Sequence, residues 1–219
     1  MLGDVFLNAF WNCTLTLSRI TPKPRAMFDD LTKVRVDWEA RLARAASDRR
    51  SPMHVPAVVT SDVDARGMVL RGFDREAGSL RFHTDVRAPK VAAIQADPRM
   101  AVLLYDKQDK VQIRLRGKGE VLSDDPRADA AWTESDNFAR RCYLGEAPGA
   151  VNETPTSGLP SAFEGVEPED HELIPARPNF AIVLITLTEV DWFYLAHTGH
   201  VRARFERHGA GWRGHWLAP

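Results

Sequence analysis

The sequence predicts a mainly β fold of the α+β class, an antiparallel barrel decorated by two or three helices. About eight short runs with strand character are present, and most of them follow one another through short loops. Helical patterns are few and do not alternate with the strands, which argues against a doubly wound parallel sheet. The length of 219 residues suits one ordinary domain with an extension.

Residues 1–27 are expected to form a poorly ordered N-terminal extension, and residues 28–219 a single domain. The uncharged segment from Val5 to Ser18 follows no sustained period, and a proline-rich break comes after it. A signal peptide is the less favoured alternative, because Asp4 stands where such a peptide carries positive charge. No run reaches the roughly 18 apolar residues that a membrane-spanning helix needs.

The first helix of the domain is predicted just after this extension. Asp29 or Asp30 can cap its N-terminus, and the pattern ends near Arg50, before Pro52. Its apolar residues recur at spacings of three or four and form one face. They are Leu31, Val34, Trp38, Leu42 and Ala45.

The middle of the chain changes to strand patterns. Strands are predicted at 57–60, 67–71, 80–84, 100–105 and 111–117. Asp74 to Gly78 is predicted to be a hairpin loop, and Lys90 to Ala96 a short helix with Pro89 in its first turn. Gly117-Lys118-Gly119 is predicted to be a strand irregularity.

The second half contains a long stretch without a regular pattern. A helical segment is predicted over 124–142, and strand patterns return at 180–187, 192–195 and 201–206. Residues 145–178 hold 6 prolines and follow no period. A segment of this kind inside a compact domain is expected to be a functional loop or a disordered one.

Charge and cysteine usage exclude several classes of protein. Lys plus Arg number 29 and Asp plus Glu 30, so the chain lacks the basic excess of a general nucleic-acid binder. Cys13 and Cys142 form no C-x-x-C motif, which excludes a thiolate zinc site and makes a reducing cytoplasm the simpler location. No histidine motif with metal-ligand spacing occurs, so no metal is predicted.

The residues that suggest chemistry are cations on the predicted strands and at the start of the short helix. They are Arg66, Arg71, Arg87, Lys90, Arg114 and Arg116. A hydroxyl, a helix N-terminus and two or three cations suit a phosphate monoester, and Thr84 precedes the helix that Lys90 begins. The alternative is that these cations are solvated and pair with nearby acids. Residue chemistry alone leaves both interpretations open.

The order of the motifs is similar to that of one known family. They run Arg66-x-x-x-x-Arg71, Phe82-His83-Thr84, Lys90, Asp97-Pro98-Arg99 and Val111-Gln112-x-Arg114-x-x-Gly117. The closing Gly211-Trp212-x-x-x-x-Leu217-x-Pro219 is similar to the family's terminal segment. From Arg35 to Pro219 the chain resembles the pyridoxamine 5′-phosphate oxidase superfamily, the FMN-binding split barrels.

The resemblance implies an antiparallel split β-barrel that works as a homodimer with FMN at the interface. It places Arg66, Thr84 and Lys90 on the FMN phosphate and Arg71 near phosphate or substrate. Where the family has Ser-Arg-Lys, this chain has Ala88-Pro89-Lys90, and Arg87 is expected to replace the lost cation.

Further positions are implied along the flavin. The strand backbone at Met68 and Val69 would lie beside it, His83 would contact flavin or phosphate, and Gln112 would face the ring. Trp192 is expected to reach in from the partner subunit.

Arg204 matches an arginine that also reaches in from the partner subunit. Just before it, His200-Val201-Arg202 reverses the Arg-x-His substrate pair of the classical oxidase. The resemblance therefore extends to the flavin more than to pyridoxamine phosphate as the substrate.

The function expected on these grounds is that of an FMN-dependent oxidoreductase acting on a small substrate, an amine being one candidate. Hydride would pass from that substrate to FMN, and no side chain stands out as a catalytic base. The alternative is a non-catalytic split barrel that binds flavin or heme. The expected partners are a small-molecule substrate and a second copy of the chain, with neither nucleic acid nor membrane.

Overall fold

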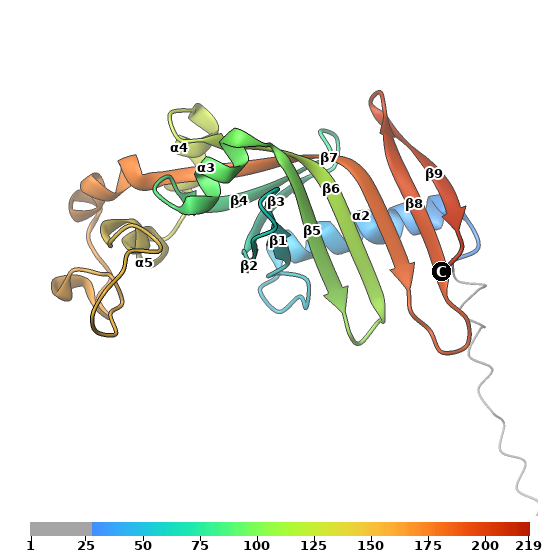
Figure 1. Cartoon of the computed structure of the whole chain (residues 1–219), viewed down its shortest axis with the longest axis horizontal. Helices are drawn as coiled ribbons and strands as arrows, with labels where there is room; N and C mark the ends of the chain where they lie inside the picture. The colour runs from blue at the N-terminus through green and yellow to red at the C-terminus, as the bar shows by residue number, and fades with distance from the viewer. Residues whose placement is uncertain (1–27) are drawn as a thin grey trace, which may run out of the picture.

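The computed structural model describes residues 28–219, so the extension predicted over 1–27 lies outside the described residues. Nine antiparallel strands form one sheet in the order β2-β1-β5-β6-β7-β4-β3, and β8 and β9 continue it from β7. The strands are β1 Ala57–Val59, β2 Ala65–Gly67, β3 Leu70–Asp74, β4 Ser79–Asp85, β5 Arg99–Asp106, β6 Val111–Leu122, β7 Phe180–Tyr194, β8 Val201–His208 and β9 Gly211–Leu217. This curled half-barrel confirms the predicted antiparallel fold (Figure 1).

The helices are few, as predicted. They are α2 Leu31–Ser47, α3 Pro89–Ala96, α4 Pro126–Thr133 and α5 Asn137–Arg140, with 3₁₀ turns η1 Arg141–Leu144, η2 Ser161–Phe163 and η3 Asp170–Asn179. Asp30 caps α2 by accepting a hydrogen bond from the Thr32 backbone N–H at 2.6 Å. Among the described residues, no helix is long and apolar enough to cross a membrane.

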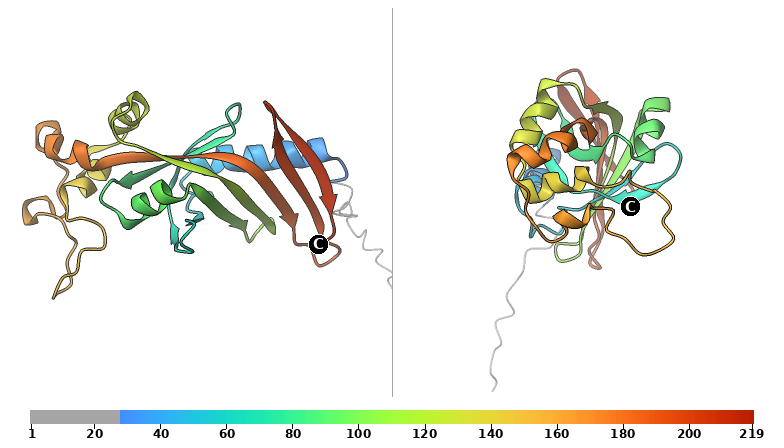
Figure 2. Two further views of the ribbon diagram at one scale, coloured as in Figure 1. Left: turned by 45° about the horizontal axis from the view of Figure 1, so that its top comes forward. Right: turned by 90° about the vertical axis from the view of Figure 1, so that its left-hand side faces the viewer.

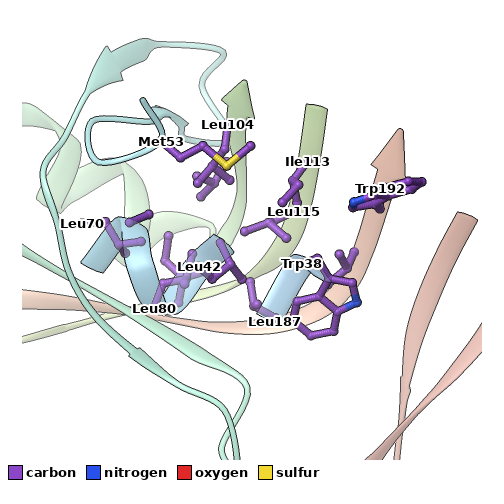
Figure 3. Packing of buried hydrophobic residues seen from close by; sticks show 14 of the residues in the cluster. Trp38, Leu42, Met53, Leu70, Leu80, Leu104, Ile113, Leu115, Leu187 and Trp192 are labelled. Atoms are coloured by element: carbon purple, nitrogen blue, oxygen red, sulfur yellow. The ribbon is translucent and has the colours of Figure 1, made fainter. Parts of the chain in front are cut away.

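The main core lies between α2 and the concave face of the sheet. Trp38 and Leu42 of α2 pack beside Leu80 and Leu115 from the strands (Figure 3). These side chains are fully buried, as the helical spacing of the apolar residues predicts. Helix α2 therefore fills the concave side of the half-barrel.

Two glycines lie where the sequence predicts a strand irregularity and a hairpin loop. The pairing of β6 with β7 shifts register between Arg116 and Gly117, which confirms the predicted irregularity. A Cβ on Gly117 would lie 2.3 Å from the Thr186 carbonyl oxygen, so only glycine fits there. Gly78 has a φ of 63° and closes the predicted β3–β4 hairpin.

Strand β7 runs along most of the molecule, from the end that carries α4 and α5 to the β8–β9 hairpin (Figure 2). It joins the two runs that the sequence predicts separately at 180–187 and 192–195. The sequence pattern does not predict β9, because Gly211 and Gly214 interrupt its alternation.

A second apolar cluster covers the beginning of β7. Ala128 and Ala131 of α4 pack there against Phe180 and Ile182. The long segment 145–178 lies at the end of the molecule where β7 begins (Figure 1). Buried Arg141 holds it by donating to the carbonyls of Phe163 and Val166 at 2.9 Å each. The segment is thus tied to the domain at defined points, although it has little regular structure.

Candidate functional site

Three predicted phosphate residues come from separate elements and gather at one edge of the half-barrel. Thr84 is the last residue on the buried face of β4. Lys90 follows it by six residues and lies in the first turn of α3. The Lys90 ammonium lies 3.4 Å from the Thr84 hydroxyl oxygen. Arg66 of β2 completes this set, which we call the Arg66–Lys90 cluster (Arg66, Thr84 and Lys90).

Arg66 is held in place by its own hairpin. Its Nη1 donates to the Thr60 hydroxyl at 2.9 Å and to the Val58 carbonyl at 3.4 Å. Its Nη2 forms an ion pair with Asp64. The Arg66 side chain is 18% exposed, and these contacts position its guanidinium.

The electrostatics of the cluster show that Arg66 and Lys90 act on each other. Burial lowers the pKa of Lys90, and the positive charge of Arg66 lowers it further. Asp85 and Asp64 offset part of this effect. Two cations with a buried hydroxyl beside them, at a helix N-terminus, form an environment that an anion would stabilise.

Arg87 is less available than the sequence suggested. Its Nε and Nη2 donate to the Asp85 carboxylate at 2.9 and 2.6 Å, a bidentate arrangement. Nη2 also donates to the Gly145 carbonyl at 3.1 Å. Arg87 therefore neutralises buried Asp85 and ties the start of the long segment to the site.

His83 and Arg71 lie on the other side of the sheet from Thr84. Successive side chains of a strand point to opposite faces, so His83 and Thr84 cannot both face the same group. A register shift between Leu70 and Gly72 places Arg71 in a bulge of β3.

The environment of His83 is apolar and positively charged. Burial, followed by the charges of Arg71 and Arg81, lowers the pKa of His83 to about 4. Its ring meets Phe180 edge-on at 5.0 Å, and within residues 28–219 its buried Nε2 has no hydrogen-bond partner. His83 is thus a neutral imidazole at pH 7, separate from the Arg66–Lys90 cluster.

Met68 and Val69 form the link between β2 and β3. The Met68 N–H donates to the Pro56 carbonyl at 3.1 Å, and the Leu70 N–H donates to the His54 carbonyl at 2.9 Å. The link is therefore fixed against the β1 side of the sheet, two residues beyond Arg66.

Gln112 lies on the convex side of the sheet, which we call the outer face. Its cross-strand neighbours are Tyr105 on β5 and Phe193 on β7. The next row on this face holds Leu103, Arg114, Asp191 and Arg204 in register.

Arg204 shares the outer face with a buried acid. Asp191 is bonded to Arg114 at 2.5 Å and to Arg202 at 2.8 Å, and these two partners lower its pKa against the opposing effect of burial. Arg204 lies 3.8 Å from Glu189, and its buried Nε has no hydrogen-bond partner among residues 28–219. In that part of the chain no hydrogen bond or ion pair connects the outer face to the Arg66–Lys90 cluster.

Trp192 corrects one expectation. Its side chain is fully buried in the core of its own chain, against Phe28 at 4.7 Å between ring centroids. Its indole N–H donates to Asp37 on α2 at 2.8 Å. A side chain in this position cannot reach into a partner's site, so the role predicted for Trp192 is wrong. Strand alternation directs its neighbour Phe193 to the outer face instead.

Three residues that bind the arginines in and near the cluster were not predicted from the sequence. Thr60 and Asp64 bind Arg66, and Asp85 binds Arg87. Each lies within two to six residues of its partner, and that short spacing is the one feature of the sequence that could have pointed to them.

Comparison with known proteins agrees with this architecture. Residues 35–123 match the family model described as "Pyridoxamine 5'-phosphate oxidase, FMN-binding domain". A pyridoxine/pyridoxamine 5′-phosphate oxidase of Sphingopyxis alaskensis is 25% identical over 211 residues, 92% of this chain and 90% of the relative. One from Caulobacter vibrioides is 27% identical over 214 residues, 91% of this chain and 89% of the relative.

Two solved structures have the same fold. A pyridoxamine 5′-phosphate oxidase-related, FMN-binding protein of Nostoc punctiforme has a TM-score of 0.67 and 26% identity, covering 84% of this chain and 96% of its own. PhzG of Burkholderia lata has a TM-score of 0.59 and 18% identity, covering 90% and 96%, and shows the fold alone.

Fold and matched domain together define a split-barrel protein of the FMN-binding type. The matched domain, the curated relatives and the solved structure of the Nostoc protein support the pyridoxamine 5′-phosphate oxidase-like superfamily as the family of this chain.

Proposed function

We propose that the chain binds FMN with its phosphate at the Arg66–Lys90 cluster and uses it as an oxidoreductase. The observation that carries the proposal is the meeting of Lys90, Thr84 and Arg66 from three elements at the first turn of α3. The match of residues 35–123 to an FMN-binding domain supports it, since this range contains the whole cluster.

The donors of the cluster fit a phosphate monoester. Lys90 supplies an ammonium that contacts a neutral hydroxyl, and Thr84 supplies that buried hydroxyl. Arg66 supplies a guanidinium already oriented by Thr60. An anion between the two cations would remove the mutual effect that lowers the pKa of Lys90.

The position proposed for the flavin ring follows from the sheet register. Leu103 faces Ala57, which in turn faces Gly67, so the outer face continues from the Arg66 strand towards Gln112. In this proposal the backbone at Met68 and Val69 lies beside the ring, and Gln112 faces it.

A second copy of the chain is part of the proposal. Arg204 and the Arg66–Lys90 cluster belong to separate surfaces of one chain, and a two-fold axis would bring one copy's Arg204 to the other's site. Leu103 and Tyr105 on the outer face are 42% and 46% exposed, which supports burial of this face against a partner.

The chemistry proposed is hydride transfer from a small substrate, an amine being one candidate. Bound FMN would supply the hydride-accepting chemistry. The chain would supply the phosphate anchor, the polar contact of Gln112 and the exclusion of water by the paired outer faces. The names of the curated relatives make pyridoxine or pyridoxamine phosphate the first substrate to test. A location in the cytoplasm is proposed on the cysteine usage alone.

Spectroscopy of the purified protein tests the proposal directly. FMN should give a yellow protein with a flavin absorption spectrum, whereas the alternative of a heme binder would give a Soret band. Arg66→Ala should weaken FMN about tenfold or more, because a charge-assisted hydrogen bond contributes about 1.5–3 kcal/mol. Equal FMN affinity in both proteins would contradict the assigned phosphate site.

A substrate screen separates catalysis from binding. Anaerobic bleaching of the bound flavin by one member of a panel of amines and phosphorylated pyridoxine compounds would support an oxidoreductase. If no member bleaches the flavin, the non-catalytic flavin binder becomes the better description.

A further inference from the structure

Asp64 pairs with the Nη2 of Arg66, the terminal nitrogen that Thr60 and Val58 do not bind. Nη1 of Arg66 is committed to the Thr60 hydroxyl and the Val58 carbonyl. Nη2 is paired with the Asp64 carboxylate. The Asp64 charge also acts on Lys90, so this acid lies in the field of both cations of the cluster.

The hairpin turn around Asp64 is held by hydrogen bonds that do not involve the Asp64 side chain. Buried Thr60 donates from its hydroxyl to Asp62 at 2.5 Å while accepting from Arg66, and Ser61 donates to the Asp97 carbonyl at 3.2 Å. The Asp64 side chain is 64% exposed, against 18% for Arg66. The carboxylate can therefore swing into water while the guanidinium stays in place.

We infer that Asp64 is a specificity-determining residue, an internal competitor of the ligand's phosphate for Arg66. The inference rests on the proposed function, because it assumes that the cluster binds the FMN phosphate. Asp64 touches the phosphate-binding arginine and not the flavin ring, so it acts on phosphorylated flavins alone.

Charge balance supports this role. In the structure Arg66 is balanced by Asp64 and Arg87 by Asp85, which leaves Lys90 as the uncompensated cation of the site. A bound phosphate carries nearly two negative charges. When Asp64 turns away, Arg66 and Lys90 together match that charge, whereas with Asp64 in place the site is one positive charge short.

The test compares the flavin affinities of the full-length wild type and Asp64→Asn. Asparagine keeps the size of the side chain but carries no charge. FMN should bind Asp64→Asn about fivefold more tightly, the factor that corresponds to an exposed ion pair near the upper end of its usual strength. Riboflavin, which lacks the phosphate, should bind both proteins equally. Inorganic phosphate should compete with FMN at lower concentration in the variant.

A charge-matched control is available on α4. Asp125 pairs with Arg127 at the same spacing of two residues, at 2.9 Å, and asparagine preserves its role as a helix cap. Asp125→Asn should leave both flavin affinities unchanged.

Several results would overturn the inference. Equal or weaker FMN binding by Asp64→Asn would show that Asp64 does not compete, or that it positions Arg66 instead. Equal tightening of FMN and riboflavin would place the effect away from the phosphate. Absence of FMN binding by both proteins would refute the proposed function as well, whereas FMN binding by the wild type with no effect of Asp64→Asn refutes this inference alone.

Discussion

The ammonium of Lys90 lies 3.4 Å from the hydroxyl oxygen of Thr84, and this contact joins the first turn of α3 to the buried end of β4. The strand and the helix are connected by only a short loop, so the contact is local in the chain. Burial lowers the pKa of Lys90, and the charge of Arg66 on β2 lowers it further. The position of the cluster at a helix start is what favours an anion there.

Removing the Lys90 charge should weaken phosphorylated flavin specifically. Lys90→Met retains the length of the buried stem, so we expect FMN affinity to fall about tenfold or more while riboflavin affinity changes little. Fluorescence titration of both flavins measures this. Exposed Lys118 on β6 provides the control, since Lys118→Met removes a charge outside the cluster. A parallel loss of riboflavin binding would indicate a structural defect instead.

The half-buried His83 should make the protein sensitive to mild acid. Its pKa is about 4 in the folded chain and about 6.5 when unfolded, so the unfolded state takes up a proton first as the pH falls. The stability that neutral His83 contributes is complete above pH 6.5 and is lost progressively towards pH 4.

Denaturant unfolding at two pH values measures this contribution. Between pH 7 and pH 5 the wild type should lose about 2 kcal/mol more of its free energy of unfolding than His83→Gln does. His171→Gln, which removes an exposed histidine of η3, should behave as the wild type. The same pH dependence in His83→Gln and the wild type would count against the assignment.

The outer face should hold two copies of the chain together. Leu103→Glu places a charge in the middle of this face, so we expect light scattering to show the mass falling to that of one 24.5 kDa chain, together with loss of flavin. Val36→Glu is the control, since Val36 is 61% exposed on α2 and away from the outer face. A wild-type mass near 24.5 kDa with flavin still bound would refute the shared site.

The chain should fold without its first 26 residues, whereas Phe28 should contribute to its stability. A protein beginning at Met27 keeps Phe28, whose ring packs on Trp192 and Tyr194 in the core, at centroid distances of 4.7 and 5.5 Å. We expect its melting temperature to match that of the full chain. Phe28→Ala should cost about 3 kcal/mol of unfolding free energy. A large loss of stability in the shortened protein would show that the extension belongs to the domain.

The sequence by itself determined the local features of this protein. The spacing of Val34, Trp38 and Leu42 determined a helix with one buried face, and the alternation from Val111 to Gly117 determined a strand with one covered face. Gly78 and Gly117 marked a turn and a register shift, because a side chain there would strain the backbone or strike it. Features of this kind depend on residues close in the chain, and that is why a period reveals them.

Only the tertiary structure decided which way the site residues face. A period of two shows that His83 and Thr84 lie on opposite faces of a strand, but not which face meets the cations. The sequence allows Trp192 to face either side of β7. In the structure it faces the side that α2 covers, where its indole N–H donates to Asp37. The pairing of Asp191 with Arg114 and Arg202 arose in the same way. Strand pairing brings these charges together across β6, β7 and β8, and no local pattern of the sequence relates them.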